Sequence, residues 1–252
     1  MKPAPTQAVA APSLSLRARL SWCAHFWKAA TQQHHRNHAA LFRRFVPHDG
    51  VVFDVGAHAG QFAKLFAGIA RDGKVYALEP GGYALSILRR VVALRRLRNV
   101  EVCPFGLSDR AHTETLHVPV KRSGAMGFGL SHFGAETRAS VAETVTLSTI
   151  DAFAAERGLA RLDFIKADIE GWEMRMLAGG AATIARFRPA LLLEVQAAHL
   201  ARAGDTPAAM WDFFTQIGYE AQLVHEESAR LAFAPAPRPL DGDVLWTPRR
   251  AR

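Results

Sequence analysis

Short apolar runs alternate with helical stretches along most of the chain. The apolar runs predict five buried strands, at residues 51–55, 74–79, 100–107, 162–168 and 190–195. Apolar positions at helical spacing predict helices between them, at residues 61–71, 83–97, 149–158 and 172–186. This alternation is typical of a parallel sheet covered by helices on both faces, because right-handed crossovers place the helices there.

Two later regions depart from this rhythm. Residues 112–148 contain two extended runs around the glycine-rich segment SGAMGFGLSHFG, which predicts two strand-like arms and a mobile loop suited to a lid or to acceptor contacts. Near the carboxyl end, a predicted helix at 207–217 precedes the runs GYEAQLVH and DVLWTP. We expect these two runs to be antiparallel closing strands of the sheet.

The amino-terminal part divides into two segments ahead of a catalytic domain at 47–252. Residues 1–13 are rich in proline and alanine and predict a flexible leader. Residues 14–46 predict one or two amphipathic helices, which could lie on a membrane surface; we favour a cap on the domain or a wall of its cleft. Three histidines there have helical spacing without a nearby cysteine or carboxylate, which favours a polar surface cluster over a metal site: His34, His35 and His38.

Composition narrows the class of protein. The 252 residues are 49% hydrophobic and 21% charged, which fits one large α/β domain with short appendages. The net charge of +8 could favour anionic partners, but the only dense arginine run, at 89–98, lies on a predicted surface helix, so no nucleic acid is expected. The two isolated cysteines, the prolines in the leader and the lack of a long apolar stretch favour a cytoplasmic protein without a transmembrane segment.

The segment FDVGAHAG, at 53–60, follows the first predicted strand and is the strongest candidate for a ligand loop. Ligands of open α/β sheets collect at the carboxyl ends of the strands. Gly56 and Gly60 allow a tight turn and a close approach of the backbone to a ligand. Asp54 could accept hydrogen bonds or offset a cation beside this loop.

An acid at the end of the second predicted strand supports the same site. Glu79 follows Gly56 by 23 positions, close to the interval of about 20 residues at which nucleotide-binding folds place an acid on ribose hydroxyls. NAD uses the same topology, but its fingerprint requires glycine where His58 stands. Acids beside the loop also suit a positive sulfonium, so S-adenosylmethionine is favoured and NAD is the alternative.

Several segments together resemble the FkbM methyltransferase family over about residues 48–225: FDVGAHAG, NVEVCPFGLSDR, STIDAF, FIKADIEGWEMRMLAGG and RPALLLEV. The family more often has asparagine where His58 stands. The resemblance implies an α/β, Rossmann-like class I methyltransferase fold, with a mostly parallel sheet, an antiparallel closing strand and helices on both faces. It also implies S-adenosylmethionine as donor, Ser108 and Asp109 near the adenine, and usually O-methylation of a small molecule, a sugar or a glycan unit.

Methyl transfer to a hydroxyl requires alignment and removal of a proton. Asp168, at the carboxyl end of the fourth predicted strand, is the first candidate for the base, and Lys166 on the same face could assist it or form a structural ion pair. Glu170 could bind acceptor hydroxyls, whereas Glu173 suits the start of the next helix. Glu194 ends the fifth predicted strand and could pair with Asp168 to hold Mg²⁺.

Three other functions remain open from the sequence. The positive charge is compatible with a methyltransferase that acts on RNA or protein. The chain could also be a non-catalytic nucleotide-binding Rossmann module or a nicotinamide oxidoreductase. A homo-oligomer is also possible.

Overall fold

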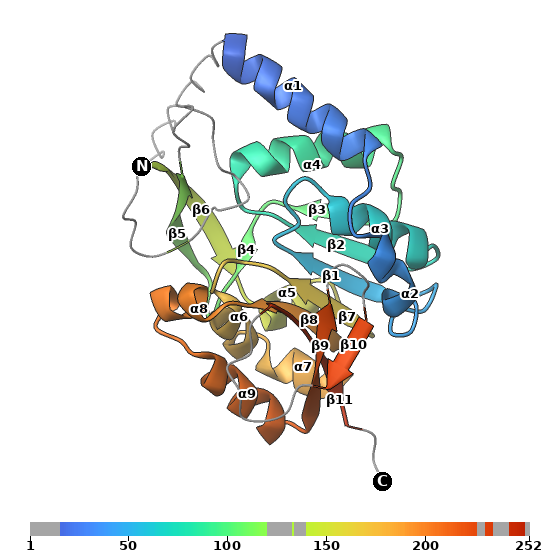
Figure 1. The fold of residues 1–252 in the computed structure, drawn as a ribbon, viewed down its shortest axis with the longest axis vertical. Coiled ribbons are helices and arrows are strands. Elements are labelled where there is room, and N and C mark those ends of the chain that lie inside the picture. Colours follow the sequence, from blue (N-terminus) through green and yellow to red (C-terminus); the bar gives the residue numbers. More distant parts are fainter. Residues whose placement is uncertain (1–15, 120–132, 134–139, 226–229, 234–241, 250–252) are drawn as a thin grey trace, which may run out of the picture.

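The computed structural model describes residues 16–119, 133, 140–225, 230–233 and 242–249. In this part of the chain the main sheet has the strand order β10-β9-β11-β8-β7-β1-β2-β3 (Figure 1). Its strands are β1 (Val51–Val55), β2 (Lys74–Leu78), β3 (Val100–Cys103), β7 (Phe164–Ala167), β8 (Ala190–Val195), β9 (Tyr219–His225), β10 (Arg230–Phe233) and β11 (Gly242–Pro248). The first five of these pair in parallel, and β11 runs antiparallel to both β8 and β9. The predicted α/β fold with antiparallel closing strands is therefore confirmed, and β10 is an additional strand.

Helices cover both faces of this sheet. They are α3 (Gln61–Ile69), α4 (Gly82–Leu94), α5 (Ile150–Glu156), α6 (Glu173–Ala178), α7 (Ala181–Phe187), α8 (Ala197–Ala203) and α9 (Pro207–Gln216). Successive side chains of a strand point to opposite faces. Phe53 accordingly packs with residues of α5, α6, α7 and α9, whereas Val52 packs with residues of α3 and α4.

The prediction of one strand over residues 100–107 was wrong. The chain leaves the main sheet after Cys103, and Gly106–Leu107 forms the short strand β4 of a second sheet with the order β4-β6-β5. Pro104 carries no backbone N–H, so it cannot donate to the ladder at this point. The other two strands, β5 (His112–Pro119) and β6 (Ser140–Ser148), pair antiparallel and are the two predicted arms. The loop predicted between them lies, except for Phe133, outside the described residues.

The prediction of a single helix over residues 172–186 was also wrong. Helices α6 and α7 are separated by Gly179 and Gly180. A Cβ atom on Gly179 would lie 2.1 Å from the carbonyl oxygen of Ser108, and one on Gly180 would lie 2.7 Å from Ile150 Cδ1. The two glycines therefore let this helical region pack directly against the β4 segment and the start of α5.

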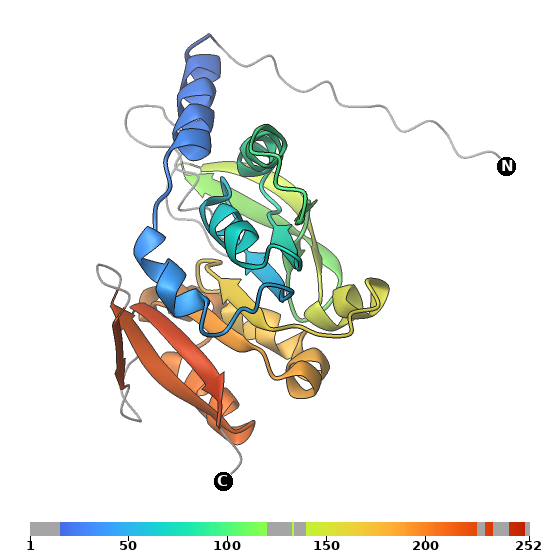
Figure 2. The same ribbon diagram turned by 90° about the vertical axis from the view of Figure 1, so that its right-hand side faces the viewer.

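The amino-terminal segment forms α1 (Leu16–Thr31), the 3-10 turn η1 (Arg36–His38) and α2 (Ala39–Phe42). Helix α1 lies along α4 at one end of the molecule (Figures 1 and 2). The Trp22 indole N–H donates to Ser86 Oγ at 2.8 Å, and Ala29 and Ala30 are buried against α4. Helix α1 thus forms the expected cap by packing on α4. The predicted leader, residues 1–13, lies outside the described residues. Among the described helices, none has both the length and the apolar character needed to cross a membrane.

A candidate ligand cleft at the carboxyl ends of the strands

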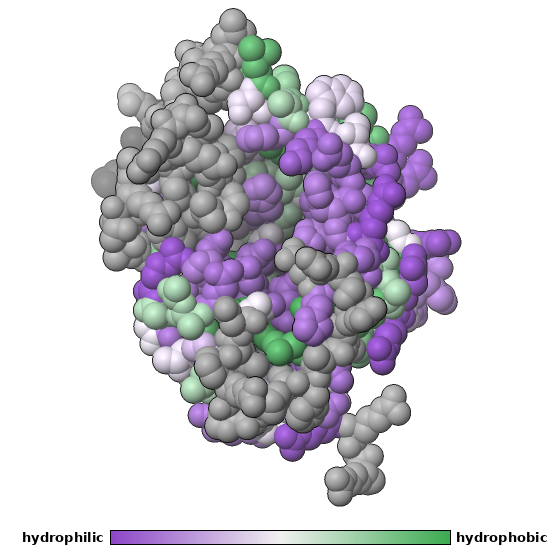
Figure 3. All heavy atoms as spheres, in the orientation of Figure 1, coloured by the Kyte–Doolittle hydropathy of each residue, from purple (hydrophilic) through white to green (hydrophobic). Residues whose placement is uncertain are grey.

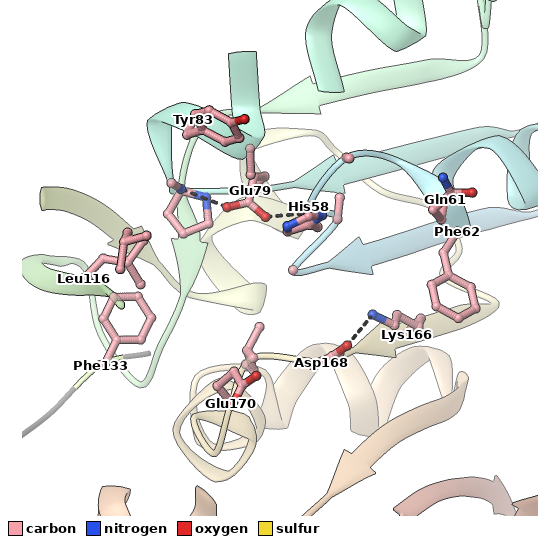
Figure 4. Close-up of a pocket in the computed structure, with 18 of the residues that line it drawn as sticks. His58, Gln61, Phe62, Glu79, Tyr83, Leu116, Phe133, Lys166, Asp168 and Glu170 are labelled. Atoms are coloured by element: carbon pink, nitrogen blue, oxygen red, sulfur yellow. Dashed lines mark hydrogen bonds and ion pairs between the residues drawn. The ribbon is translucent and has the colours of Figure 1, made fainter. Parts of the chain in front are cut away.

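A cleft of about 290 Å³ opens where β1, β2 and β7 end (Figure 4). Strand β1 lies between β2 and β7, which is the point where the strand order reverses. The chain runs from β1 outward to β2 and β3 and then returns to the other side of β1 at β7. Open α/β sheets bind ligands in the crevice at such a reversal. The volume is close to the lower end of the range for small-molecule sites, about 300 to 1,000 Å³. The cleft wall includes three of the predicted cofactor residues and all three predicted catalytic residues: Gly56, His58, Glu79, Lys166, Asp168 and Glu170. Gly60 is not part of the wall, but its chain neighbours Ala59 and Gln61 are.

The loop after β1 depends on glycine at two positions. Gly56 has a φ of 72°, and a Cβ atom on it would lie 2.1 Å from the carbonyl oxygen of Asp168. Gly60 has a φ of 84° at the start of α3, and a Cβ atom there would lie 2.8 Å from Leu88 Cδ1. The left-handed region of φ strains most other residues. Gly56 therefore lets the first loop pass directly against the loop after β7, and Gly60 lets the start of α3 approach α4.

Glu79 is buried at the end of β2, with 8% of its surface exposed, and faces the cleft. Its Oε2 accepts the backbone N–H of His58 at 2.8 Å, and its Oε1 accepts that of Gly81 at 2.9 Å (Figure 4). Burial raises the pKa of Glu79 to about 7, although both hydrogen bonds lower it. The carboxyl group therefore has a defined orientation, and each oxygen keeps a lone pair for a ligand in the cleft.

Lys166 and Asp168 form an ion pair on the opposite wall. Lys166 Nζ lies 3.6 Å from Asp168 Oδ2 and 4.7 Å from the centre of the Phe62 ring. The Lys166 side chain is buried, whereas 44% of the Asp168 side chain is exposed toward the cleft. Burial is the largest single effect and raises the pKa of Asp168, but the Lys166 charge and the hydrogen bonds from Glu194 and Lys166 together outweigh it, so the net pKa of this carboxyl is lowered. Asp168 is therefore ionised and accessible at neutral pH.

Asp54 lies behind this pair, outside the cleft wall. It is fully buried and sits beside Lys166 in the register of β1 and β7. Burial raises the pKa of Asp54 to about 6, and the charge of Lys166 opposes that rise. The charges of Asp54 and Lys166 therefore partly balance each other. A direct contact of Asp54 with a cofactor stays a prediction.

Glu194, at the end of β8, forms the predicted carboxylate pair with Asp168. The two side chains share a hydrogen bond, and Gln196 Nε2 donates to Glu194 Oε1 at 2.8 Å. Burial, with the Asp168 charge second, raises the pKa of Glu194 to about 8, so Glu194 holds the shared proton at neutral pH. Within the described residues, no group of three or more His, Cys, Asp or Glu side chains could hold a metal ion. The predicted Mg²⁺ site therefore gains no support from the geometry.

The two glutamates that follow Asp168 have different surroundings. Glu170 lines the cleft and pairs with His199 at 3.0 Å and with Arg202 at 3.4 Å, both on α8. Burial raises the pKa of Glu170 to about 7. Glu173 is buried and accepts the backbone N–H of Ile169 at 3.0 Å, which closes the turn into α6 and fits the expected role at a helix start.

Ser108 and Asp109 lie outside the cleft wall. Ser108 is fully buried, accepts the indole N–H of Trp172 at 3.2 Å and donates to Asp109 Oδ1 at 3.0 Å. These bonds join the end of β4 to the turn before α6. Their implied proximity to an adenine stays a prediction.

The cleft also contains residues that no motif in the sequence identified. The second sheet supplies Leu116, Val118 and Glu143, and Glu143 accepts the N–H of Gly82 at 2.9 and 3.1 Å, which ties β6 to the start of α4. The amino-terminal segment supplies His35, whose ring stacks on Phe62 with centroids 4.6 Å apart. The predicted polar surface cluster of histidines was therefore wrong for His35, which lines the cleft, and for His38, which is fully buried. The sequence predicted a cap or cleft wall for the amino-terminal segment and acceptor contacts for the loop between the arms, but it did not identify these particular residues.

The strand order and the position of the cleft define a Rossmann-like fold of the class I methyltransferase type. The sequence profile of the methyltransferase FkbM domain matches residues 54–221. The chain therefore belongs to the FkbM methyltransferase family.

Similar proteins include the AMB antimetabolite synthetase AmbE of Pseudomonas aeruginosa, which is 30% identical over 215 residues. The alignment covers 71% of this chain but only 10% of AmbE. Among solved structures, the FkbM methyltransferase of Methylobacillus flagellatus KT is 16% identical with a TM-score of 0.49, and the match covers 90% of this chain and 59% of that one. Fibrillarin of Aeropyrum pernix, in complex with natively bound S-adenosyl-L-methionine, is 16% identical with a TM-score of 0.44, covering 88% of this chain and 76% of the other.

Proposed function

We propose that this protein transfers the methyl group of S-adenosylmethionine to a hydroxyl group of a small molecule, a sugar or a glycan unit. The observation that carries the proposal is a single cleft with two different carboxyl groups on facing walls. Glu79 is held by backbone N–H groups at the end of β2, and Asp168 is ionised and accessible at the end of β7. Membership of the FkbM family supports the reaction class.

The residues around the first loop fit S-adenosylmethionine. The remaining lone pairs of Glu79 can accept ribose hydroxyl groups, since carboxylates accept several hydrogen bonds at once. The negative charge of Asp168 favours the sulfonium, which supplies a methyl group already activated for transfer. His58 stands where a dinucleotide fingerprint needs glycine for the approach of the pyrophosphate, so NAD is disfavoured.

Asp168 is the group that accepts the acceptor's proton. As the acceptor oxygen forms its bond to the methyl carbon, its O–H proton must leave, and Asp168 is the exposed carboxylate on the wall that faces Glu79. Lys166 keeps Asp168 ionised until this step. The proton on Glu194 donates a hydrogen bond to Asp168, which holds the carboxylate in one orientation for the in-line displacement.

A divalent cation at the Asp168–Glu194 pair is the alternative way to activate the acceptor. It would have to displace the proton that Glu194 holds and compete with Lys166 for Asp168. The two routes are separated by exhaustive EDTA treatment of the active enzyme. Unchanged turnover after this treatment would exclude the cation, whereas loss of turnover that Mg²⁺ restores would support it.

The first test is calorimetric titration of the protein with S-adenosylmethionine and S-adenosylhomocysteine, with NAD as a control. We expect micromolar binding of both sulfur compounds and no binding of NAD. An acceptor screen that begins with sugars then follows, with transfer of a labelled methyl group as the readout. Binding of NAD without either sulfur compound would overturn the proposal.

A further inference from the structure

Helix α1 carries apolar residues on two opposite faces. Its inner face, with Trp22 and Phe26, packs on α4. Its outer face carries Leu20, Ala24 and Trp27, which share one side of the helix because they are four and seven positions apart. Leu20 is 63% exposed and Trp27 is 57% exposed. The outer face is therefore a second apolar stripe that the described part of the chain leaves in water.

A third large exposed hydrophobic residue lies in the same layer. Leu94, in the last turn of α4, is 52% exposed. In Figure 3, hydrophobic residues are visible at the end of the molecule where Figure 1 places α1. The two packed helices α1 and α4 thus carry three of the exposed large hydrophobic residues, and large apolar side chains in water are typical of a surface that contacts a partner or a membrane.

The same layer is strongly cationic. Residues 16–48 and 82–100 contain no aspartate or glutamate. The exposed basic residues of α1, α4 and the turn after α4 are Arg19, Lys28, Arg89, Arg90, Arg95, Arg96 and Arg98. Arg90 also lies over the Trp22 ring, 4.8 Å from its centre, at the junction of the two helices. A helix layer that combines exposed Leu and Trp with basic residues alone is complementary to a negatively charged lipid surface.

We propose that the layer formed by α1 and α4 docks on the surface of an anionic lipid bilayer. Leu20 and Trp27 enter the boundary between headgroups and acyl chains, where tryptophan is preferred. The exposed arginines of α4 and of the turn after it contact lipid phosphates. RNA would use the cations too, but phosphate binding gives no role to exposed leucines, so lipid fits this surface better.

The docking surface adjoins the cleft. His25 of α1 and the hydroxyl of Tyr83 are 2.7 Å apart, and Tyr83, in the first turn of α4, lines the cleft. A docked protein would therefore hold the cleft next to the lipid surface. The docking itself does not depend on the proposed methyl transfer.

The test is flotation of the full chain with vesicles of phosphatidylcholine alone and of phosphatidylcholine mixed with phosphatidylglycerol. We expect binding to the mixed vesicles and little to the neutral ones. Leu20→Gln/Trp27→Gln should weaken partitioning about tenfold or more, because two exposed apolar side chains no longer insert. Arg89→Gln/Arg96→Gln should weaken it about 25-fold, since each basic residue near an anionic surface contributes about fivefold.

Arg186→Gln/Arg249→Gln is the matched control. It removes the same charge from α7 and from the residue after β11, both distant from α1 in Figure 1, and should leave vesicle binding unchanged. Circular dichroism and S-adenosylmethionine titration of each variant separate loss of docking from loss of folding or of the cofactor site. The proposal is overturned if the wild-type chain does not bind anionic vesicles, or if the control weakens binding as much as Arg89→Gln/Arg96→Gln does. It is also overturned if the surface binds RNA but not vesicles.

Discussion

The two facing walls of the cleft hold their carboxyl groups in opposite ways. Glu79 is buried, and backbone N–H groups from two different loops bind its two oxygens. Asp168 is 44% exposed, and its partners are titratable side chains, Lys166 and Glu194. The first wall is suited to hold a ligand in a fixed position, because its partners are backbone groups that do not titrate. The second wall is suited to exchange a proton, because Asp168 and Glu194 already share one.

Asp168→Asn tests the second wall, where Asp168 is proposed to accept a proton, and it has the largest expected effect. Removal of a general base lowers turnover by about 100- to 10,000-fold. Binding of S-adenosylmethionine, measured by calorimetry, should weaken far less than turnover, because Glu79 is untouched and only the attraction between the Asp168 charge and the sulfonium is lost. Asp212→Asn, on the exposed surface of α9, is the control and should change neither quantity. Full turnover in Asp168→Asn would remove this residue from the reaction.

Gly56→Ala tests the contact between the two walls. The new Cβ atom would lie 2.1 Å from the carbonyl oxygen of Asp168 at a φ of 72°, so one of the two loops must move. We expect the free energy of unfolding to fall by about 2–4 kcal/mol and cofactor affinity to fall by about 100-fold or more. Gly68→Ala, inside α3 with open space around its Cβ position, should instead stabilise the protein by about 0.5–1 kcal/mol. Equal urea midpoints for the two variants would contradict this account of the loop.

Glu79→Gln tests the first wall, where backbone N–H groups fix the carboxyl group. Glutamine has the same shape, but its amide nitrogen would face one of the two backbone N–H donors, from His58 or Gly81. We expect the Kd for S-adenosylmethionine to rise about 10- to 100-fold, because the amide nitrogen cannot accept a ribose hydroxyl and a lost hydrogen bond to a charged group costs about 1.5–3 kcal/mol. Glu220→Gln, on the exposed start of β9, serves as the control. An unchanged Kd in Glu79→Gln would show that this carboxyl group does not bind the cofactor.

The pH dependence of stability gives the smallest expected effect. The pKa of Glu194 is raised from 4.5 to about 8 in the folded state. The folded protein therefore retains a proton that the unfolded chain loses, and the free energy of unfolding falls as pH rises through this window. Glu194→Gln should flatten this fall without abolishing it, because burial also raises the pKa values of Glu79, Glu170 and Glu173. Urea titrations at the two ends of the window measure the slope, and an identical slope in the variant would contradict the proton assignment.

Some of the cleft could be predicted because its chemistry is local. Gly56 and Gly60 mark a turn that other residues adopt only with strain, and Glu79 and Asp168 follow apolar runs that read as strands. In a parallel sheet the carboxyl ends of such strands meet at one edge. The positions of the strand ends in the sequence are therefore sufficient to predict this cleft.

Other parts could not be predicted because they depend on contacts between distant segments. Gly179 and Gly180 divide a helix-like pattern because the backbone of Ser108 and the side chain of Ile150 press against them. Asp54 has the spacing of a cofactor residue, but the register of β1 and β7 places it behind Lys166. The hydrophobic periodicity of one segment cannot predict such a neighbour, because the neighbour comes from another part of the chain.

The amino-acid sequence by itself determined the α/β alternation, the glycine loop and the acids at the strand ends, because strand burial, backbone strain and charge are properties of short segments. Tertiary structure alone decided which of these residues face the cleft. It decided that Glu194 holds the proton of the predicted Asp168–Glu194 pair, and it brought His35 and the β5–β6 sheet to the same cleft wall. It also left Leu20 and Trp27 exposed, because packing against α4 buries only one face of a helix that is apolar on two.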